Sequence, residues 1–473
     1  MTTSATREAS RVYSSPAGQR SGRRVFIDEV LSWAGHFNKT PSFGAVFPRS
    51  CDVFVCHDRA GEHAYNSPLF RPGAPMLTRT RKPRPRAFID PFTKTEIKRL
   101  VAEFGSPLLI IDCQRVREQY RKLHKALPGV DLHYALKPLP HPAVVQTIVE
   151  LGGWLDLATT GETQLVTQLG IDPARCIHTH PIKRAIDIRN ALHLGVKIFV
   201  ADNPDEVRKF EPYRDQCELL LRVSFRSPGA VCDLSRKFGC DPEDLLELAR
   251  LARKLAIPVR GLSFHVGSQA ADAGKHVEAI EACGKLIAAA KREKLGVFDT
   301  LDIGGGFPIE YAQKVTDIGR FCAPIRAALA KLPSKLRVIA EPGRYISGPA
   351  AIGVSSVMGR ARREGHWWYY LDDGLYGSYS GQLFDHARYP VESLKESDEK
   401  FASVLAGPTC DSIDVIAENL MLPALKAGDL IVGRAMGAYT WASASEFNFF
   451  PKATVVSVNR QPGDTGSVIP LPF

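Results

Sequence analysis

The chain has 473 residues, of which 44% are apolar and 24% charged, and its formal net charge is +10. This length and composition are typical of a globular protein with more than one domain and exclude a disordered or fibrous chain. No stretch approaches the 18 consecutive apolar residues of a membrane span. The ten cysteines are scattered along a chain that begins without an apolar signal core, which predicts a reducing, cytoplasmic setting without a disulfide framework.

Residues 1–88 are predicted to form a basic N-terminal extension. Residues 1–86 hold fourteen Arg or Lys against six Asp or Glu, whereas the rest of the chain is almost balanced. A nucleic-acid surface needs its basic groups on one folded face, so this distribution argues against a nucleic-acid partner. The Pro- and Arg-rich run at 80–86 favours a solvated linker. An arm that docks on an anionic surface and an organelle transit peptide are the alternatives.

Four residues of the extension have side chains that bind zinc in other proteins, namely Cys51, Cys56, His57 and His63. Their spacing matches no common zinc finger. The sequence therefore predicts no metal site.

After residue 105, short β-branched runs alternate with longer helical patterns. Eight strands with a helix between each pair predict a (β/α)8 barrel over residues 113–347, with an open doubly wound sheet as the alternative. The expected strands are 132–137, 154–158, 176–179, 197–201, 219–223, 259–265, 300–303 and 337–341. The expected helices are 142–151, 161–169, 185–194, 204–210, 242–255, 274–293 and 317–331.

Two further segments flank the predicted barrel. Beyond residue 348 the helical period gives way to short strands and turn residues, so residues 348–473 are expected to form a β-rich, Greek-key-like domain. Residues 89–112 are expected to be a lead-in segment that could pair with that domain. The predicted class is thus α/β, with a (β/α)8 barrel followed by a β domain.

Polar residues gather where the expected strands end. Active sites of barrel enzymes are built at the C-terminal ends of the strands, so these positions are candidates for chemistry. They are Lys137, Asp156, His180, Arg222, His265, the run Gly304-Gly305-Gly306, and Glu341.

Lys137 closes the apolar run Tyr134-Ala135-Leu136-Lys137. A buried amine is costly unless it is paired or neutralised. A Schiff base with an aldehyde would neutralise it, and pyridoxal phosphate is the cofactor that uses lysine in this way. A salt bridge to Asp156 is the alternative.

The glycine run at 304–306 and the segment Glu341-Pro342-Gly343-Arg344 follow the last two expected strands. Barrels often bind phosphate at this place, and backbone without side chains can surround a phosphate with N–H groups. Arg344 would neutralise the phosphate, and Glu341 would keep a pyridine nitrogen protonated. His265 could stack on the ring or be a structural histidine.

Six motifs then occur in order along residues 105–455. They are Tyr134-Ala135-Leu136-Lys137, Ser263-Phe264-His265-Val266-Gly267-Ser268, Asp302 to Pro308, Ala340 to Tyr345, Asp373-Gly374-Leu375-Tyr376-Gly377, and Gly407-Pro408-Thr409-Cys410-Asp411. With these motifs the sequence resembles the fold type III, alanine-racemase-like decarboxylases that depend on pyridoxal 5'-phosphate. Within that group it is most similar to the ornithine and lysine/ornithine decarboxylases.

The resemblance implies a set of cofactor-binding residues, in which Lys137 carries the cofactor, His265 stacks on it and Glu341 contacts its ring nitrogen. The full set is Lys137, Asp156, Arg222, His265, Ser268, Gly304, Gly305, Gly306, Glu341, Arg344 and Tyr439. It also implies a head-to-tail homodimer with shared active sites, in which Cys410 and Asp411 act across the interface. Cys410 would then return a proton to the substrate carbon.

The resemblance assigns substrate binding to Asp385 and Asp411. Two carboxylates suit the side-chain ammonium of a basic diamino acid. Ornithine, giving putrescine for polyamine biosynthesis, or lysine, giving cadaverine, is expected.

Several other activities stay open. The same fold serves diaminopimelate decarboxylases, which usually show Cys-Glu-Ser where this chain has Cys410-Asp411-Ser412, and decarboxylases of D-ornithine or D-lysine. A racemase and a non-catalytic regulatory paralogue are further alternatives, although a paralogue of that kind would be expected to lose Lys137, Asp156 or Cys410.

Overall fold

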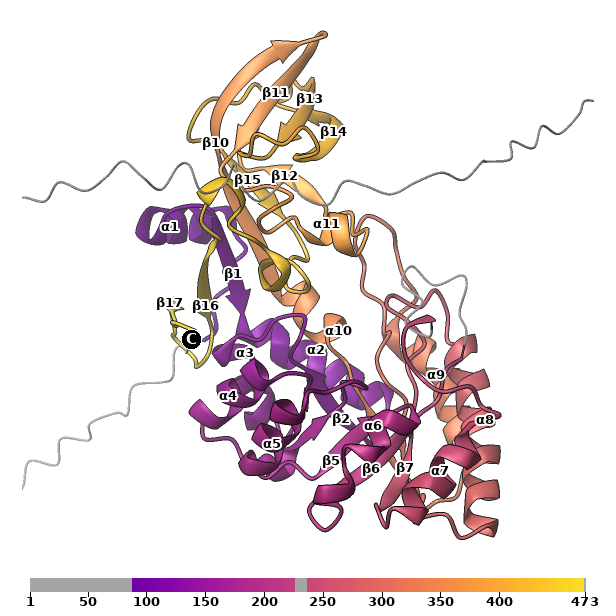
Figure 1. Ribbon diagram of the computed structural model, residues 1–473. Helices are drawn as coiled ribbons and strands as arrows, with labels where there is room; N and C mark the ends of the chain where they lie inside the picture. The colour runs from indigo at the N-terminus through magenta and orange to yellow at the C-terminus, as the bar shows by residue number, and fades with distance from the viewer. Residues whose placement is uncertain (1–86, 226–235, 472–473) are drawn as a thin grey trace, which may run out of the picture. The chain divides into compact units, whose positions relative to one another are not determined.

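The structure is a computed structural model that describes residues 87–225 and 236–471 (Figure 1). The expectations for residues 1–86 therefore lie outside the described residues. These are the linker with its two alternatives and the zinc-type residues Cys51, Cys56, His57 and His63.

Within the described ranges, eight parallel strands close into a barrel in chain order, from β2 through β9 and back to β2. The predicted barrel is confirmed, and the open doubly wound sheet is wrong because β2 pairs with both β3 and β9. The barrel strands are β2 (Val130–Ala135), β3 (Trp154–Leu157), β4 (Cys176–His178), β5 (Ile198–Ala201), β6 (Glu218–Arg222), β7 (Val259–Ser263), β8 (Thr300–Asp302) and β9 (Arg337–Ala340).

Helices surround the barrel strands (Figure 1). The local sequence explains where these helices begin and which face they bury. Thr159 caps the helix that follows it and accepts a hydrogen bond from the N–H of Glu162 at 3.3 Å. The helix α8 buries a row of residues three or four positions apart. The helices are α2 (Cys113–Ala126), α3 (Pro142–Glu150), α4 (Thr160–Gln168), α5 (Ala185–Leu194), α6 (Pro204–Arg208), α7 (Leu245–Lys254), α8 (Gly274–Arg292), α9 (Ile318–Leu329) and α10 (Arg344–Ser347). Short 3-10 turns are η1 (Pro173–Arg175), η2 (Glu211–Tyr213) and η4 (Gly348–Ala350).

Several strands end earlier than the sequence indicated. Lys137 and His265 lie two residues beyond β2 and β7, and Glu341 lies one residue beyond β9. Single backbone hydrogen bonds continue past these ends, from Leu136 to Asp156 at 3.2 Å and from Phe264 to Asp302 at 3.0 Å, but the regular pairing of the strands stops. After β2 the pairing is also stopped by Pro138, which has no N–H to donate. The three side chains therefore stand on loops above the barrel.

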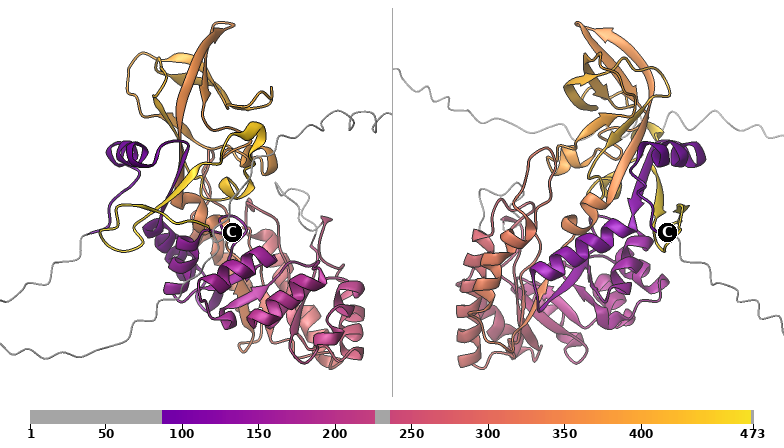
Figure 2. Two further views of the ribbon diagram at one scale, coloured as in Figure 1. Left: turned by 60° about the vertical axis from the view of Figure 1, so that its left-hand side comes forward. Right: turned by 180° about the vertical axis from the view of Figure 1, so that it is seen from behind.

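The second part of the described chain is a mixed sheet, which confirms the expected β-rich domain. Its nine strands within the described residues include β1, which precedes the barrel in sequence and pairs antiparallel with β10 and parallel with β16. Figure 2 shows the long β10–β11 hairpin in two further views. The strands are β1 (Leu108–Asp112), β10 (Ala351–Arg363), β11 (His366–Leu371), β12 (Val391–Ser393), β13 (Phe401–Ala406), β14 (Val415–Leu422), β15 (Leu430–Gly433), β16 (Thr454–Val458) and β17 (Ser467–Val468), with helices α1 (Lys94–Phe104) and α11 (Gly381–Phe384) and turns η5 (Trp441–Ser443) and η6 (Phe447–Phe449).

A tight turn after β11 is built around the buried carboxylate of Asp373. Its Oδ1 accepts hydrogen bonds from the backbone N–H groups of Gly374 and Ser378, at 2.9 and 2.8 Å. Burial raises the pKa of Asp373 to about 6. This turn positions Tyr376, which donates a hydrogen bond to Asp411.

None of the helices in the described ranges is both long enough and apolar enough to cross a lipid bilayer.

Gly261 marks a close approach of two barrel strands and gives a test of the packing. A methyl group there would lie 1.8 Å from the carbonyl oxygen of Thr300 on β8. We predict that Gly261→Ala lowers the free energy of unfolding by about 3 kcal/mol, because the strands must separate. In the control Gly359→Ala on β10, a methyl group would meet nothing within 4 Å, and the change should stay below about 0.5 kcal/mol. Denaturant unfolding followed by circular dichroism measures both, and equal losses would contradict the explanation.

Asp373 gives a pH-dependent test. Its pKa in the unfolded chain is near 3.8, so between about pH 4 and pH 6 the native state binds more protons than the unfolded state, and stability falls as pH rises through that window. Asp373→Asn removes this titration and keeps the accepting oxygen. From pH 5 to pH 7.5 the variant should gain about 1 kcal/mol of unfolding free energy relative to the wild type. A stability difference that stays constant with pH would contradict the raised pKa.

Candidate active site

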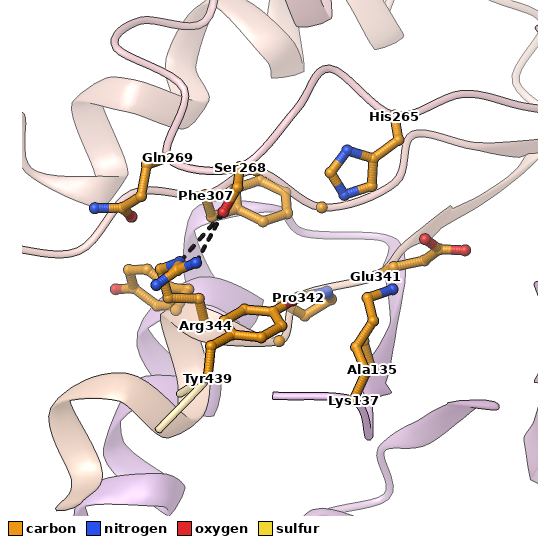
Figure 3. Close-up of a pocket in the computed structure, with 14 residues that line it drawn as sticks. Ala135, Lys137, His265, Ser268, Gln269, Phe307, Glu341, Pro342, Arg344 and Tyr439 are labelled. Carbon is orange, nitrogen blue, oxygen red and sulfur yellow. Dashed lines mark hydrogen bonds between the residues drawn. The ribbon is translucent and has the colours of Figure 1, made fainter. Parts of the chain in front are cut away.

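A cavity opens at the C-terminal end of the barrel, where the loops after four strands meet one turn of the β domain (Figure 3). Figure 3 shows Lys137 and Glu341 at one end of the cavity and Arg344, Ser268 and Tyr439 at the other. Eight of the residues proposed from sequence line it: Lys137, His265, Ser268, Gly305, Gly306, Glu341, Arg344 and Tyr439.

The amine of Lys137 enters the cavity next to a buried carboxyl. Its Nζ lies 3.7 Å from Oδ2 of Asp156, and the Lys137 side chain is 42% exposed, whereas that of Asp156 is 1% exposed. Burial lowers the pKa of Lys137, but Asp156 and then Tyr439 and Glu341 raise it more, so the net shift is upward. Thr179 donates a hydrogen bond of 2.5 Å to the other oxygen of Asp156. The ion pair left open by the sequence is therefore present, and it leaves the amine accessible from the cavity.

Glu341 lies close to a second buried carboxyl, that of Asp302. Burial, followed by the charge of Asp302, raises the pKa of Glu341 well above its ordinary value. Burial also raises the pKa of Asp302 to about 6. Arg222, at the end of β6, is a cation that lowers both pKa values without lining the cavity. A basic ring nitrogen placed at Glu341 would find a carboxyl able to share a proton with it.

The glycine run after β8 is closely surrounded by neighbouring loops. A Cβ atom at Gly305 would lie 2.8 Å from the carbonyl oxygen of Glu341 and 3.1 Å from Nε2 of His265. Gly304 and Gly306 have φ values of +65° and +95°, which side chains disfavour. Only glycine thus fits these three positions without displacing the wall of the cavity, which leaves bare backbone facing it.

Arg344 supplies positive charge beside that backbone. Its guanidinium donates to Oγ of Ser268 at 3.0 Å and to Oη of Tyr311 at 2.7 Å. The ring of Tyr439 lies 4.7 Å from the guanidinium carbon. Arg344 also forms an ion pair with Asp385, which follows α11. An anionic group held by the glycine run would meet this guanidinium.

His265 forms part of the cavity wall as a neutral ring. Its Nδ1 accepts a hydrogen bond of 3.0 Å from the N–H of Gly267. Burial, and then the positive charges of Arg222 and Lys137, hold the pKa of His265 well below its ordinary value. A neutral imidazole suits contact with the face of a planar ring.

Three contacts in this region were missed by the sequence analysis. Tyr311 accepts from Arg344, Nε2 of His276 lies 3.0 Å from the carbonyl oxygen of Gly305, and Asp302 accepts from the N–H of Gly304 at 2.9 Å. Asp302 could have been noticed at the end of its strand. Nothing local distinguishes Tyr311 or His276: Tyr311 lies in the long loop between β8 and α9, and His276 lies in the first turn of α8.

The structure does not bring every candidate to this cavity. His180 lies beside Lys183 and Arg184 in another hollow of the barrel rim. Cys410 and Asp411 lie on a loop of the β domain and do not line the cavity around Lys137. Cys410 is exposed, and its backbone N–H donates to Oδ1 of Asn448 at 3.0 Å.

The loop that bears Cys410 lies among exposed apolar side chains. Tyr376 stacks on Phe447 with ring centroids 4.4 Å apart. Phe449 is 99% exposed and Ile413 is 52% exposed. This surface of the β domain is therefore apolar around a thiol and a carboxylate.

The chain is similar to proteins of known family. Residues 113–348 match the family model described as pyridoxal-dependent decarboxylase, pyridoxal binding domain. The chain is 34% identical to the lysine/ornithine decarboxylase of Selenomonas ruminantium, over 78% of this chain and 94% of that protein. It is 34% identical to the ornithine decarboxylase of Schizosaccharomyces pombe, over 73% of this chain and 82% of the other.

The fold is also similar to solved structures. The crystal structure of lysine/ornithine decarboxylase from Vibrio vulnificus complexed with cadaverine is 53% identical, with a TM-score of 0.75 over 78% of this chain and 97% of that one. The lysine decarboxylase of Selenomonas ruminantium is 33% identical, with a TM-score of 0.75 over 80% and 98% of the two chains. The resemblance drawn from the six motifs is thereby confirmed. The chain belongs to the family of pyridoxal-dependent decarboxylases.

Proposed function

We propose that this chain removes the carboxylate of a basic diamino acid, ornithine or lysine, as carbon dioxide, and so produces putrescine or cadaverine for polyamine biosynthesis. The observation that carries the proposal is the cavity with the Lys137 amine and Glu341 at one end and Arg344 with Ser268 and Tyr439 at the other, with Gly305 and Gly306 in its wall. The Lys137 amine, Glu341 and Arg344 suit the aldehyde, the ring nitrogen and the phosphate of a single cofactor.

The residues present fit pyridoxal 5'-phosphate. Lys137 would hold its aldehyde carbon, Glu341 its ring nitrogen and His265 the face of its ring. Its phosphate would lie against Ser268, the glycine run at 304–306, Arg344 and Tyr439. When bound, this cofactor accepts the electron pair that is left as the carboxylate departs from the substrate.

The chain's own side chains then hold and move protons. Glu341 keeps a proton at the ring nitrogen, because its buried carboxyl has a raised pKa and needs a cationic neighbour. Asp156 orients the Lys137 amine at its end of the cavity. The thiol of Cys410 returns a proton to the substrate carbon after carbon dioxide has left.

Substrate choice is assigned to the carboxylates of Asp385 and Asp411, which would bind the distal ammonium of a diamino acid. The relatives support this assignment, since they are named lysine/ornithine and ornithine decarboxylases. Structures from Vibrio vulnificus contain cadaverine and putrescine. The cysteines that the structure describes are free, which supports a cytoplasmic location.

We further propose a homodimer in which each site takes Cys410 and Asp411 from the partner. Neither residue lines the Lys137 cavity of its own chain, and both lie on an apolar, exposed surface of the β domain. An exposed phenylalanine such as Phe449 is typical of a contact that a second copy covers.

Substrate identity is tested by carbon dioxide release from L-ornithine, L-lysine, L-arginine, D-ornithine, D-lysine and meso-diaminopimelate. We predict that L-ornithine or L-lysine gives the highest kcat/KM. Lys137→Ala should lower that value by about a thousandfold and remove the visible absorption of the bound cofactor. The control Lys335→Ala changes an exposed lysine and should leave both unchanged. A preference for diaminopimelate would contradict the roles given to Asp385 and Asp411.

Sharing of the site is tested by co-expressing Lys137→Ala with Cys410→Ala. Each variant alone should have little activity. In a random mixture half of the dimers pair the two variants, and each such dimer has one intact site, so about a quarter of wild-type activity should return. The control pair Lys137→Ala with Glu341→Ala changes two residues of the same cavity. It should recover no activity, because both residues belong to the cavity of one chain and every site then carries one of the two substitutions. Equal recovery in both pairs would contradict the assignment.

A further inference from the structure

The arginine that would bind the cofactor phosphate is already held by a carboxylate. Arg344 forms an ion pair with Asp385, and their side chains are 5% and 14% exposed. Asp385 is also one of the two residues assigned to the distal ammonium of the substrate. One carboxylate therefore has two possible partners, an arginine at the cofactor end and a substrate cation.

The hydrogen bonds of the guanidinium show how closely it is engaged. Nε and Nη2 donate to Oγ of Ser268, Nη1 donates to Oη of Tyr311, and Nη2 also donates to Oδ2 of Asp385. All three nitrogens thus have protein partners. These hydrogen bonds use four of the five N–H donors of the guanidinium. A phosphate that binds Arg344 through two N–H groups therefore has to take over at least one of them.

We propose that Asp385 occupies Arg344 in the cofactor-free chain, and that phosphate binding displaces Asp385 and makes its carboxylate available to the substrate's distal ammonium. This inference rests on the proposed function and adds an order to it, because the cofactor end is completed before the distal pocket becomes able to bind a cation. Asp385 acts through Arg344 at the cofactor end and is a positioning residue there.

Asp385 is the partner that phosphate should displace, because it is the only acidic member of the set named above. A phosphate and a carboxylate on one guanidinium repel each other, and little water is present to screen them at these exposures. Ser268 and Tyr311 carry hydroxyl groups, which can donate to a phosphate and need not leave.

The position of Asp385 allows such a change. It follows the four-residue helix α11 and precedes His386, whose φ is +51°. Asp385 lines a second cavity beyond the cofactor site, together with Tyr311 and Gln269, and Gln269 lines both cavities. Arg344 lines the first cavity and Asp385 the second, so the ion pair connects the walls of two cavities.

Two binding equilibria that share one carboxylate are coupled, and the coupling is reciprocal. Phosphate at Arg344 strengthens diamine binding because it frees Asp385. A diamine at Asp385 strengthens phosphate binding because it removes the competing anion. Without the carboxylate, phosphate binds more tightly and the coupling disappears.

The first test measures the cofactor end alone. Apoprotein is titrated with pyridoxal 5'-phosphate and with pyridoxal, and the ratio of the two dissociation constants isolates the phosphate contact. Asp385→Asn should raise this ratio in favour of the phosphorylated form by about tenfold. The control Glu310→Gln removes an exposed carboxylate next to Tyr311 and should leave the ratio unchanged. An unchanged ratio in Asp385→Asn would overturn the proposal.

The second test measures the coupling with probes that undergo no reaction. Cadaverine binding to the apoprotein is measured by calorimetry with inorganic phosphate or with sodium chloride at equal ionic strength, since salt alone screens charge. Phosphate should tighten cadaverine binding several-fold in the wild type and have no effect in Asp385→Asn. If phosphate does not change the affinity of the wild type for cadaverine, the proposed release of Asp385 is wrong.

These outcomes are separate from failure of the proposed function. If ornithine and lysine are not substrates, the carbon dioxide assay shows it, while the pyridoxal ratio still reports whether Asp385 competes for Arg344. If decarboxylation proceeds and the ratio does not respond, the proposed function stands and the inference about Asp385 is wrong.

Discussion

The balance of charge at the mouth of the barrel is the constraint on which the site depends. Asp156, Asp302 and Glu341 are each less than 9% exposed, and the cations beside them are Lys137 and Arg222. A buried carboxylate without a partner costs several kcal/mol, so such groups either gain a cation or keep a proton. Burial raises the pKa values of Asp302 and Glu341, and for Glu341 the charge of Asp302 adds to the rise. A ring nitrogen that carries a proton beside Glu341 would add a third cation and balance the three carboxylates.

Glycines in the loop after β8 let the backbone segments around these charged groups approach closely. Between His265 and Glu341 there is no space for a Cβ atom at Gly305, so the loops after β7, β8 and β9 can approach one another. Asp302 then fixes the glycine run through the N–H of Gly304. The carboxyl of Asp302 therefore affects both the charge balance and the shape of the glycine run at 304–306. For this reason the two ends of the cavity are not independent.

The sequence predicted the barrel because its strands and helices alternate with clear periods, and it predicted Lys137 and Glu341 because charge after an apolar strand is rare. It overran the ends of β2 and β7 because Leu136 and Phe264 continue the apolar pattern after regular strand pairing has stopped. Tyr311 and His276 were missed for a related reason. Their roles depend on which loop lies opposite, and the hydrogen bonds to Arg344 and Gly305 join residues 33 and 29 positions apart.

In the proposed function, the barrel and the β domain contribute different groups to the reaction. The barrel contributes the amine, the glycine run and the buried carboxyls, whereas Asp385 and Asp411 lie on loops of the β domain after α11 and β13. Such a division would let the substrate end change while the cofactor end is preserved, since insertions and substitutions are tolerated in loops. The ion pair between Arg344 and Asp385 crosses that division. A substitution at Asp385 would therefore also change the contacts of Arg344 at the cofactor end. This coupling limits which substitutions the distal pocket can accept.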